Sequence, residues 1–143
     1  MSGNRRTWLV VAVACALVAA LVAGPAVGAT ALDATLSDKV ETPKAGSGTG
    51  SATITLNASK GRVCYAITVK HVGTMMAGHI HKGGKGVAGP ISLALFTKPT
   101  KSPKGCVKAS KSLVRAILKK PSAYYVNVHT AKFPAGAARG QLH

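Results

Sequence analysis

The sequence predicts an all-β fold, a β-sandwich with Greek-key connections and one short helix. Three features carry this prediction: short runs in which apolar and polar residues alternate, clusters of Gly, Pro, Asn and Ser between the runs, and a single stretch with helical periodicity. The run over 63–69 shows the alternation best, because Val63, Tyr65 and Ile67 fall on one face of an extended strand. We infer a half-buried strand there.

The other elements follow from the same patterns along the chain. Further strands are expected at 31–36, 52–56, 79–81, 91–96, 124–130 and 138–142, which makes about seven short strands in all. The helix is expected within 110–121, with Leu113, Ile117 and Leu118 on one side. The lysine-rich run 97–111 is expected to be a solvated basic loop.

The N-terminus predicts export. An arginine pair at 5–6 precedes an apolar run over 8–23, and Pro25 and small residues follow. This order is typical of a signal peptide, so we expect residues 1–29 to be a signal peptide that is removed by cleavage after Ala29. The alternative is an uncleaved membrane anchor, and the arginine pair also fits a twin-arginine signal. Cleavage would leave a single domain over 30–143, without a membrane span, that is secreted or lies at the cell surface or in the periplasm.

Cys64 and Cys106 are the two cysteines of the expected mature domain. An even pair in an exported chain indicates a disulfide, because the export compartments are oxidising. Closing a loop of this length would stabilise the fold by about 4 kcal/mol in the chain-entropy description. A thiolate metal site or a catalytic thiol would need a reducing compartment, so we predict the bridge.

The charge of the chain is strongly positive and unevenly distributed. Its formal net charge is +16, all three acidic residues lie before residue 42, and sixteen Lys or Arg follow without one Asp or Glu. Such a surface attracts anions, so the expected partners are an anionic cell-surface polymer or a small anion. The basic residues are scattered, and no specific nucleic-acid-binding motif accompanies them. Hydrolysis by a pair of carboxylates and Ser-His-Asp catalysis both need an Asp or Glu. Because none follows residue 41, neither mechanism can be built from that part of the chain.

Two short runs carry the candidate functional residues. His79 and His81 are two positions apart, so in a strand they share one face at a spacing of about 6.5–7 Å. His129 could supply a third metal ligand, and three imidazoles suit copper or zinc. The alternative is that the histidine pair hydrogen-bonds the glycine-rich loop over 83–89. Arg139 could likewise contact a small anion or bond to backbone carbonyls near the segment FPAG, over 133–136.

The order and spacing of five segments resemble the CHRD domain, which is named for the secreted developmental inhibitor chordin and also occurs in microbial exported proteins. The segments are ATLSDKVETP, GSATITL, VCYAITV, HIHKGGKGVAGPISLALF and YYVNVHTAKFPAGAARGQL, and together they cover nearly the whole expected mature chain. The resemblance implies an extracellular β-sandwich of the immunoglobulin-like or superoxide-dismutase-like type. It implies no particular partner for this chain.

The histidine pattern also resembles the copper site of copper/zinc superoxide dismutases. Those enzymes use an HxH pair on one strand, a later strand histidine and an arginine near the C-terminus, to which HIH, VNVHT and AGAARGQL are similar. The resemblance implies that His79, His81 and His129 bind copper and that Arg139 contacts a small anion. The bridging histidine has no counterpart here and the aspartate of the zinc site is absent. At most a copper-only site is implied.

Two functions from different classes follow. The first is an exported, non-catalytic binding domain that holds a transition metal through the three histidines and anionic surface components through its basic face. The second is a copper-only enzyme that acts on superoxide or a related small anion. Because the bridging histidine and the zinc site are missing, the sequence favours the binding domain.

Overall fold

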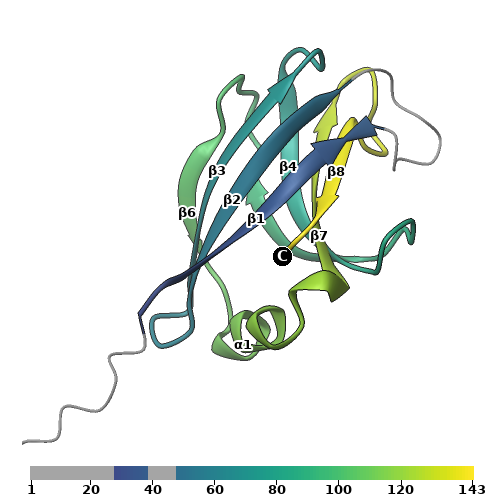
Figure 1. The fold of residues 1–143 in the computed structure, drawn as a ribbon. Coiled ribbons are helices and arrows are strands. Elements are labelled where there is room, and N and C mark those ends of the chain that lie inside the picture. Colours follow the sequence, from purple (N-terminus) through teal and green to yellow (C-terminus); the bar gives the residue numbers. More distant parts are fainter. Residues whose placement is uncertain (1–27, 39–47) are drawn as a thin grey trace, which may run out of the picture.

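The computed structural model describes residues 28–38 and 48–143, so nearly all of the expected signal peptide lies outside the described residues. Within these ranges the chain forms eight strands, one α-helix and one short 3-10 turn (Figure 1). In chain order they are β1 (Thr30–Ser37), β2 (Thr49–Asn57), β3 (Arg62–Lys70), β4 (Met75–Lys82), β5 (Ile91–Phe96), β6 (Lys104–Lys108), α1 (Lys111–Lys119), the turn η2 (Pro121–Ala123), β7 (Tyr124–Thr130) and β8 (Ala138–Gln141).

The eight strands belong to one antiparallel sheet with the order β5-β4-β7-β8-β1-β2-β3-β6. Strands β1, β2 and β3 form a meander, whereas the chain crosses from β3 to β4 and from β6 to β7. The two outermost strands, β5 and β6, also contact each other, so the sheet curls until it is nearly closed (Figure 1). The predicted all-β fold, a sandwich of barrel-like form with one short helix, is confirmed.

Strand alternation places the core inside this curled sheet. In the paired strands β1 and β2, Leu36 and Ile54 are almost completely buried, and the same holds for Ile80 on β4 and Val128 on β7. Side chains alternate between the two faces of a strand, so burying these apolar positions turns their neighbours to the outer face. In β4 and β7 those neighbours are histidines, a tyrosine and an asparagine.

The helix α1 covers one end of the curled sheet (Figure 1). Ser110 caps its N-terminus, because the serine hydroxyl accepts a hydrogen bond from the backbone N–H of Leu113 at 3.2 Å. The helix was predicted correctly, but its buried face is centred on Val114 and Ile117, while Leu113 and Leu118 are only partly buried. In the described part of the chain, no helix has the length and apolarity needed to cross a membrane.

The run 97–111 is not the continuous loop that the sequence predicts, because Lys104–Lys108 forms the edge strand β6. Its two lysines and Cys106 are exposed, and the residues between them are half-buried. Lysines that point outward from an edge strand hinder its pairing with another chain. Because the run 97–111 is rich in such lysines, its composition resembles that of a loop. Cys106 lies directly opposite Cys64 on β3, and the two are bridged, which confirms the predicted disulfide.

Candidate metal centre

A polar patch lies on the outer face of β4, β7 and β8. Core-facing residues on these strands turn the residues between them outward. His79 on β4 lies opposite Asn127 on β7, and Asn127 lies opposite Arg139 on β8. At the next outward position, His81 lies opposite Tyr125. Asn127 is therefore at the centre of the patch, with the third histidine two positions further along β7.

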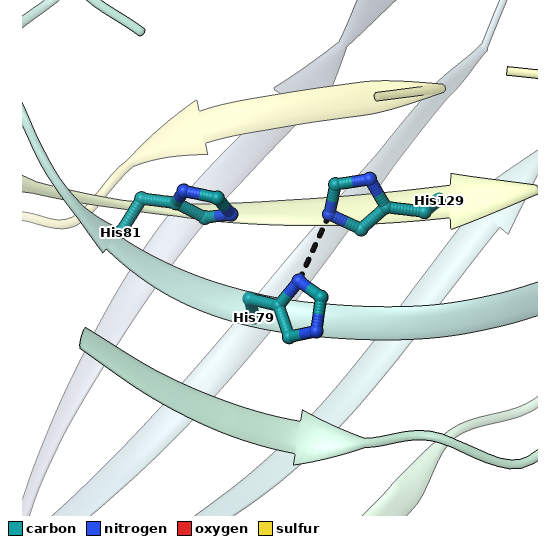
Figure 2. A group of neighbouring side chains, drawn as sticks. All are labelled: His79, His81 and His129. Carbon is teal, nitrogen blue, oxygen red and sulfur yellow. Dashed lines mark hydrogen bonds between the residues drawn. The ribbon is translucent and has the colours of Figure 1, made fainter. Parts of the chain in front are cut away.

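The three predicted histidines meet on this face. Figure 2 shows the rings of His79 and His81, from β4, and of His129, from β7, turned toward one another. Nδ1 of His79 is 3.0 Å from Nε2 of His129, and one nitrogen from each ring lies within 4.8 Å of the other two. The strand register accounts for this convergence, because Ala77 and His79 pair with His129 and Asn127 across β4 and β7. The group is close enough to hold one metal ion.

Hydrogen bonds determine which nitrogen of each ring is free to bind a metal. Nδ1 of His129 donates to the carbonyl oxygen of Pro134 at 3.0 Å, and Nδ1 of His81 donates to that of Gly89 at 2.9 Å. A carbonyl can only accept, so Nε2 of each neutral ring carries a lone pair. Nδ1 of His79 must then donate to Nε2 of His129. If this proton moves to Nε2 of His79, which gives the other neutral tautomer, Nδ1 of His79 carries a lone pair as well, and each ring then offers one nitrogen to an ion.

Burial keeps all three imidazoles neutral. It lowers the pKa of His79 from 6.5 to about 4, and the neighbouring rings of His129 and His81 add to the effect when they are charged. Burial also lowers the pKa values of His81 and His129, against the opposing effect of their hydrogen bonds to backbone carbonyls. Neutral imidazole is the form that binds a metal. The cluster is therefore in its ligand form at neutral pH.

The loop between β4 and β5 fixes the orientation of His81. The carbonyl of Gly89 accepts the Nδ1 proton of His81, and the N–H of Gly89 donates to the hydroxyl of Tyr125 at 3.1 Å. A Cβ atom at Gly89 would collide with the carbonyl oxygen of Lys82, so this position requires glycine. The alternative expected for the histidine pair thus holds for His81, which binds the loop with one nitrogen and leaves the other free. His79 bonds His129 instead.

The family model of the CHRD domain matches residues 32–142, from β1 to the residue that follows β8. The chain belongs to the CHRD domain family. Neither the curated proteins nor the solved structures gave a match to it. Membership of the CHRD family supports a domain of the non-catalytic type, and the likeness of the histidine pattern to copper/zinc superoxide dismutases stays a prediction.

Arg139 of this CHRD domain is buried, with 4% of its surface exposed. Its Nη2 donates to the carbonyl oxygens of Val87 at 3.0 Å and Gly84 at 3.3 Å. The guanidinium lies 3.5 Å from the centre of the Tyr125 ring, and the imidazole of His81 stacks on the same ring with centroids 4.9 Å apart. Bonds from Arg139 to backbone carbonyls were expected near 133–136, but those found go to the loop between β4 and β5. Contact with an anion stays a prediction.

Asn127 and Gln141 of the CHRD domain site were not predicted from the sequence, and Gly89 was predicted only as part of the glycine-rich loop over 83–89. Asn127 is 3% exposed and its Oδ1 has no hydrogen-bond partner among the residues described. Gly89 orients His81, and Nε2 of Gln141 donates to the carbonyl of Gly83 at 2.9 Å, which holds the same loop. The alternation over 124–130 contained a signal for Asn127, because it places residues 125, 127 and 129 on one face.

Proposed function

We propose that this chain is an exported, non-catalytic CHRD-domain protein that binds one transition-metal ion through His79, His81 and His129, copper in preference to zinc. The observation that carries the proposal is the convergence of three imidazole nitrogens within 4.8 Å of one another. Imidazole suits both metals, and a given nitrogen site binds Cu(II) more tightly than Zn(II). Three protein ligands leave one coordination position open.

The hydrogen bonds around the cluster support metal binding. Metal-ligating histidines usually donate their second ring N–H to a carbonyl or carboxylate, which fixes the tautomer and the ring orientation. His81 and His129 both do so, toward Gly89 and Pro134. The ligand nitrogens are thus oriented before an ion arrives. Within the described ranges, no carboxylate joins the ligand group, so the ion would keep its positive charge and attract anions.

The basic surface supports the second part of the proposal, which is binding to an anionic cell-surface polymer after export by the predicted signal peptide over 1–29. Arg62 on β3 lies opposite Lys108 on β6, and both are exposed on the outer face together with Lys104. Neither strand carries an acidic residue, so no negative charge on these strands offsets the three positive ones. Adsorption of the purified domain to an anionic polymer should therefore weaken as salt is added.

A copper-only enzyme acting on superoxide or a related small anion is the second candidate. Arg139 is the observation that favours it, because its guanidinium and the imidazole of His81 both pack on the ring of Tyr125, which places a positive charge beside the cluster. Copper-loaded protein that dismutates superoxide, and loses that activity in Arg139→Gln, would favour the enzyme. Copper-loaded protein without this activity would exclude the enzyme and favour the non-catalytic binding domain.

The double variant His79→Gln/His81→Gln tests the proposed metal site. Wild-type protein is expected to retain one copper per chain after dialysis, and the double variant none. His143→Gln is the matched control, because His143 is exposed and lies outside the ligand group. Titration calorimetry, elemental analysis and a melting curve should be recorded for each variant. Unchanged copper stoichiometry in the double variant, or a lowered melting temperature with no wild-type copper binding, would overturn the proposal.

A further inference from the structure

A small cavity lies beside the histidine cluster on the outer face of the sheet. Its volume is about 170 Å³. Its walls are His81, Tyr125, Asn127 and Arg139, together with small residues of the β4–β5 and β7–β8 loops. A cavity of this size has room for a molecule of several non-hydrogen atoms, well below the size of a drug-like ligand.

Two buried acceptor atoms on this cavity lack a partner. Oδ1 of Asn127 and Nε2 of His81 make no hydrogen bond to any described residue. Buried polar atoms are nearly always bonded, and an unbonded one lowers the stability of the fold unless something else satisfies it. The lone pair of His81 is assigned to the metal ion. Oδ1 of Asn127 is therefore the acceptor that remains for a ligand.

The same cavity also presents a positive charge. Arg139 forms part of the wall, and both of its hydrogen bonds to backbone carbonyls use the single nitrogen Nη2. Among the residues that the structure describes, no acidic side chain lines the cavity. A ligand that satisfies both walls must carry a negative charge for Arg139 and a hydrogen-bond donor for Asn127.

We propose that this cavity binds a small oxyanion that keeps one O–H group, of which hydrogencarbonate is the simplest probe. Its charged oxygens face the guanidinium of Arg139, and its O–H donates to Oδ1 of Asn127. The inference rests on the proposed function in one respect, which is that an ion at the three histidines would add a second positive charge beside the anion. The walls formed by Asn127, Arg139 and Tyr125 do not depend on that ion.

Nitrate is the discriminating competitor. It has the planar shape and single negative charge of hydrogencarbonate but no O–H to donate. A basic surface alone would bind both anions alike, whereas an unpartnered acceptor favours the anion that can donate. We expect hydrogencarbonate to bind about tenfold more tightly than nitrate, in keeping with one additional hydrogen bond to a buried group.

NMR titration of metal-free protein at slightly alkaline pH tests this expectation. The Nε–H signal of Arg139 and the backbone amide of Gly89 should shift with each anion and give two dissociation constants. Equal affinities, or no saturable shift with hydrogencarbonate, would overturn the inference.

The variant Asn127→Leu separates a ligand-binding role from a structural one. It replaces an unpartnered polar group by an apolar group of similar size, so the melting temperature should stay the same or rise. The preference for hydrogencarbonate should disappear. Arg115→Gln is the control for general charge effects, because Arg115 is exposed on α1, and it should leave the preference intact. A preference that survives in Asn127→Leu, or a marked loss of stability, would overturn the role of Asn127.

Copper binding measured on the same preparations distinguishes the two proposals. If wild-type protein prefers hydrogencarbonate but binds no copper, the proposed metal site is wrong and the proposed anion cavity is supported. Protein that binds copper without discriminating the anions would overturn only the cavity. Copper-loaded protein should bind hydrogencarbonate more tightly than metal-free protein, because the ion adds positive charge beside it.

Discussion

Nδ1 of His79 and Nε2 of His129 lie 3.0 Å apart, which is a hydrogen-bond distance and also a separation that two ligands of one ion can have. With metal–nitrogen bonds of about 2.0–2.1 Å and near-tetrahedral or smaller angles, two ligand nitrogens lie about 2.9–3.4 Å from each other. The proton between His79 and His129 therefore lies between two nitrogens that could both bind one ion. Binding of the ion through Nδ1 of His79 requires this proton to move to Nε2 of the same ring, which keeps the imidazole neutral.

We expect copper to remain bound well below the pH range in which exposed histidines titrate. A lowered pKa favours the neutral ligand form, so protons compete for His79 only as the pH falls from 6.5 toward about 4. The pKa values of His81 and His129 are shifted in the same direction, mainly by burial. Equilibrium dialysis across a pH series at constant free copper should place the half-loss of copper clearly below 6.5.

A peptide covering residues 75–82 is the control for this pH dependence. It contains His79 and His81 but cannot bury them, so it should release copper in the ordinary histidine range. If the folded domain and the peptide release copper at the same pH, the cluster is not the buried neutral site described above.

The strands that build the site could be predicted because each carries a plain alternation of apolar and polar residues. Ile80 on β4 pairs with Val126 on β7, and both face the core, so the histidines on either side of such residues face outward together. The disulfide could also be predicted, since two cysteines in a domain that is expected to be exported have few other roles. The edge strand Lys104–Lys108 was not predicted, because its outward lysines leave only a weak alternation of apolar and polar residues.

For Asn127 and Gly89 the sequence indicated a strand face and a glycine-rich loop, but not the part that either residue has in the site. The importance of Asn127 comes from strand register, which places it between His79 and Arg139. Register across β4, β7 and β8 depends on the whole curled sheet and is not a local property of any segment. Gly89 owes its role to a close approach of Lys82, across a loop whose path the glycine count alone does not determine.

The variant Gly89→Ala should weaken both the fold and metal binding. Its Cβ would collide with the carbonyl of Lys82, so the loop must shift and the bonds from Gly89 to His81 and Tyr125 must lengthen or break. Loss of one such orienting bond typically lowers metal affinity by about 10- to 100-fold. We expect this loss, together with a decrease of about 1–3 kcal/mol in the free energy of unfolding.

Gly84→Ala is the matched control in the same loop. A Cβ at Gly84 meets no atom within 4 Å, so copper affinity and stability should change little. Urea unfolding and copper titration of both variants provide the comparison. If the two substitutions have equal effects, the backbone of Gly89 does not orient His81.

Replacing the disulfide should reduce stability without touching the metal site. The bridge joins Cys64 and Cys106, which are 42 residues apart, and opening a loop of that length is expected to cost about 4 kcal/mol of unfolding free energy. It lies on the outer face of β3 and β6, while the histidines lie on β4 and β7. Strands β8, β1 and β2 separate β7 from β3, and β5 separates β4 from β6 where the sheet nearly closes. Urea unfolding of Cys64→Ala/Cys106→Ala should therefore show the loss, and copper stoichiometry at low denaturant should match wild type.

Wild-type protein treated with a reductant should behave like the double variant. A double variant that keeps full stability, or one that stays folded but no longer binds copper, would contradict this separation of the two sites.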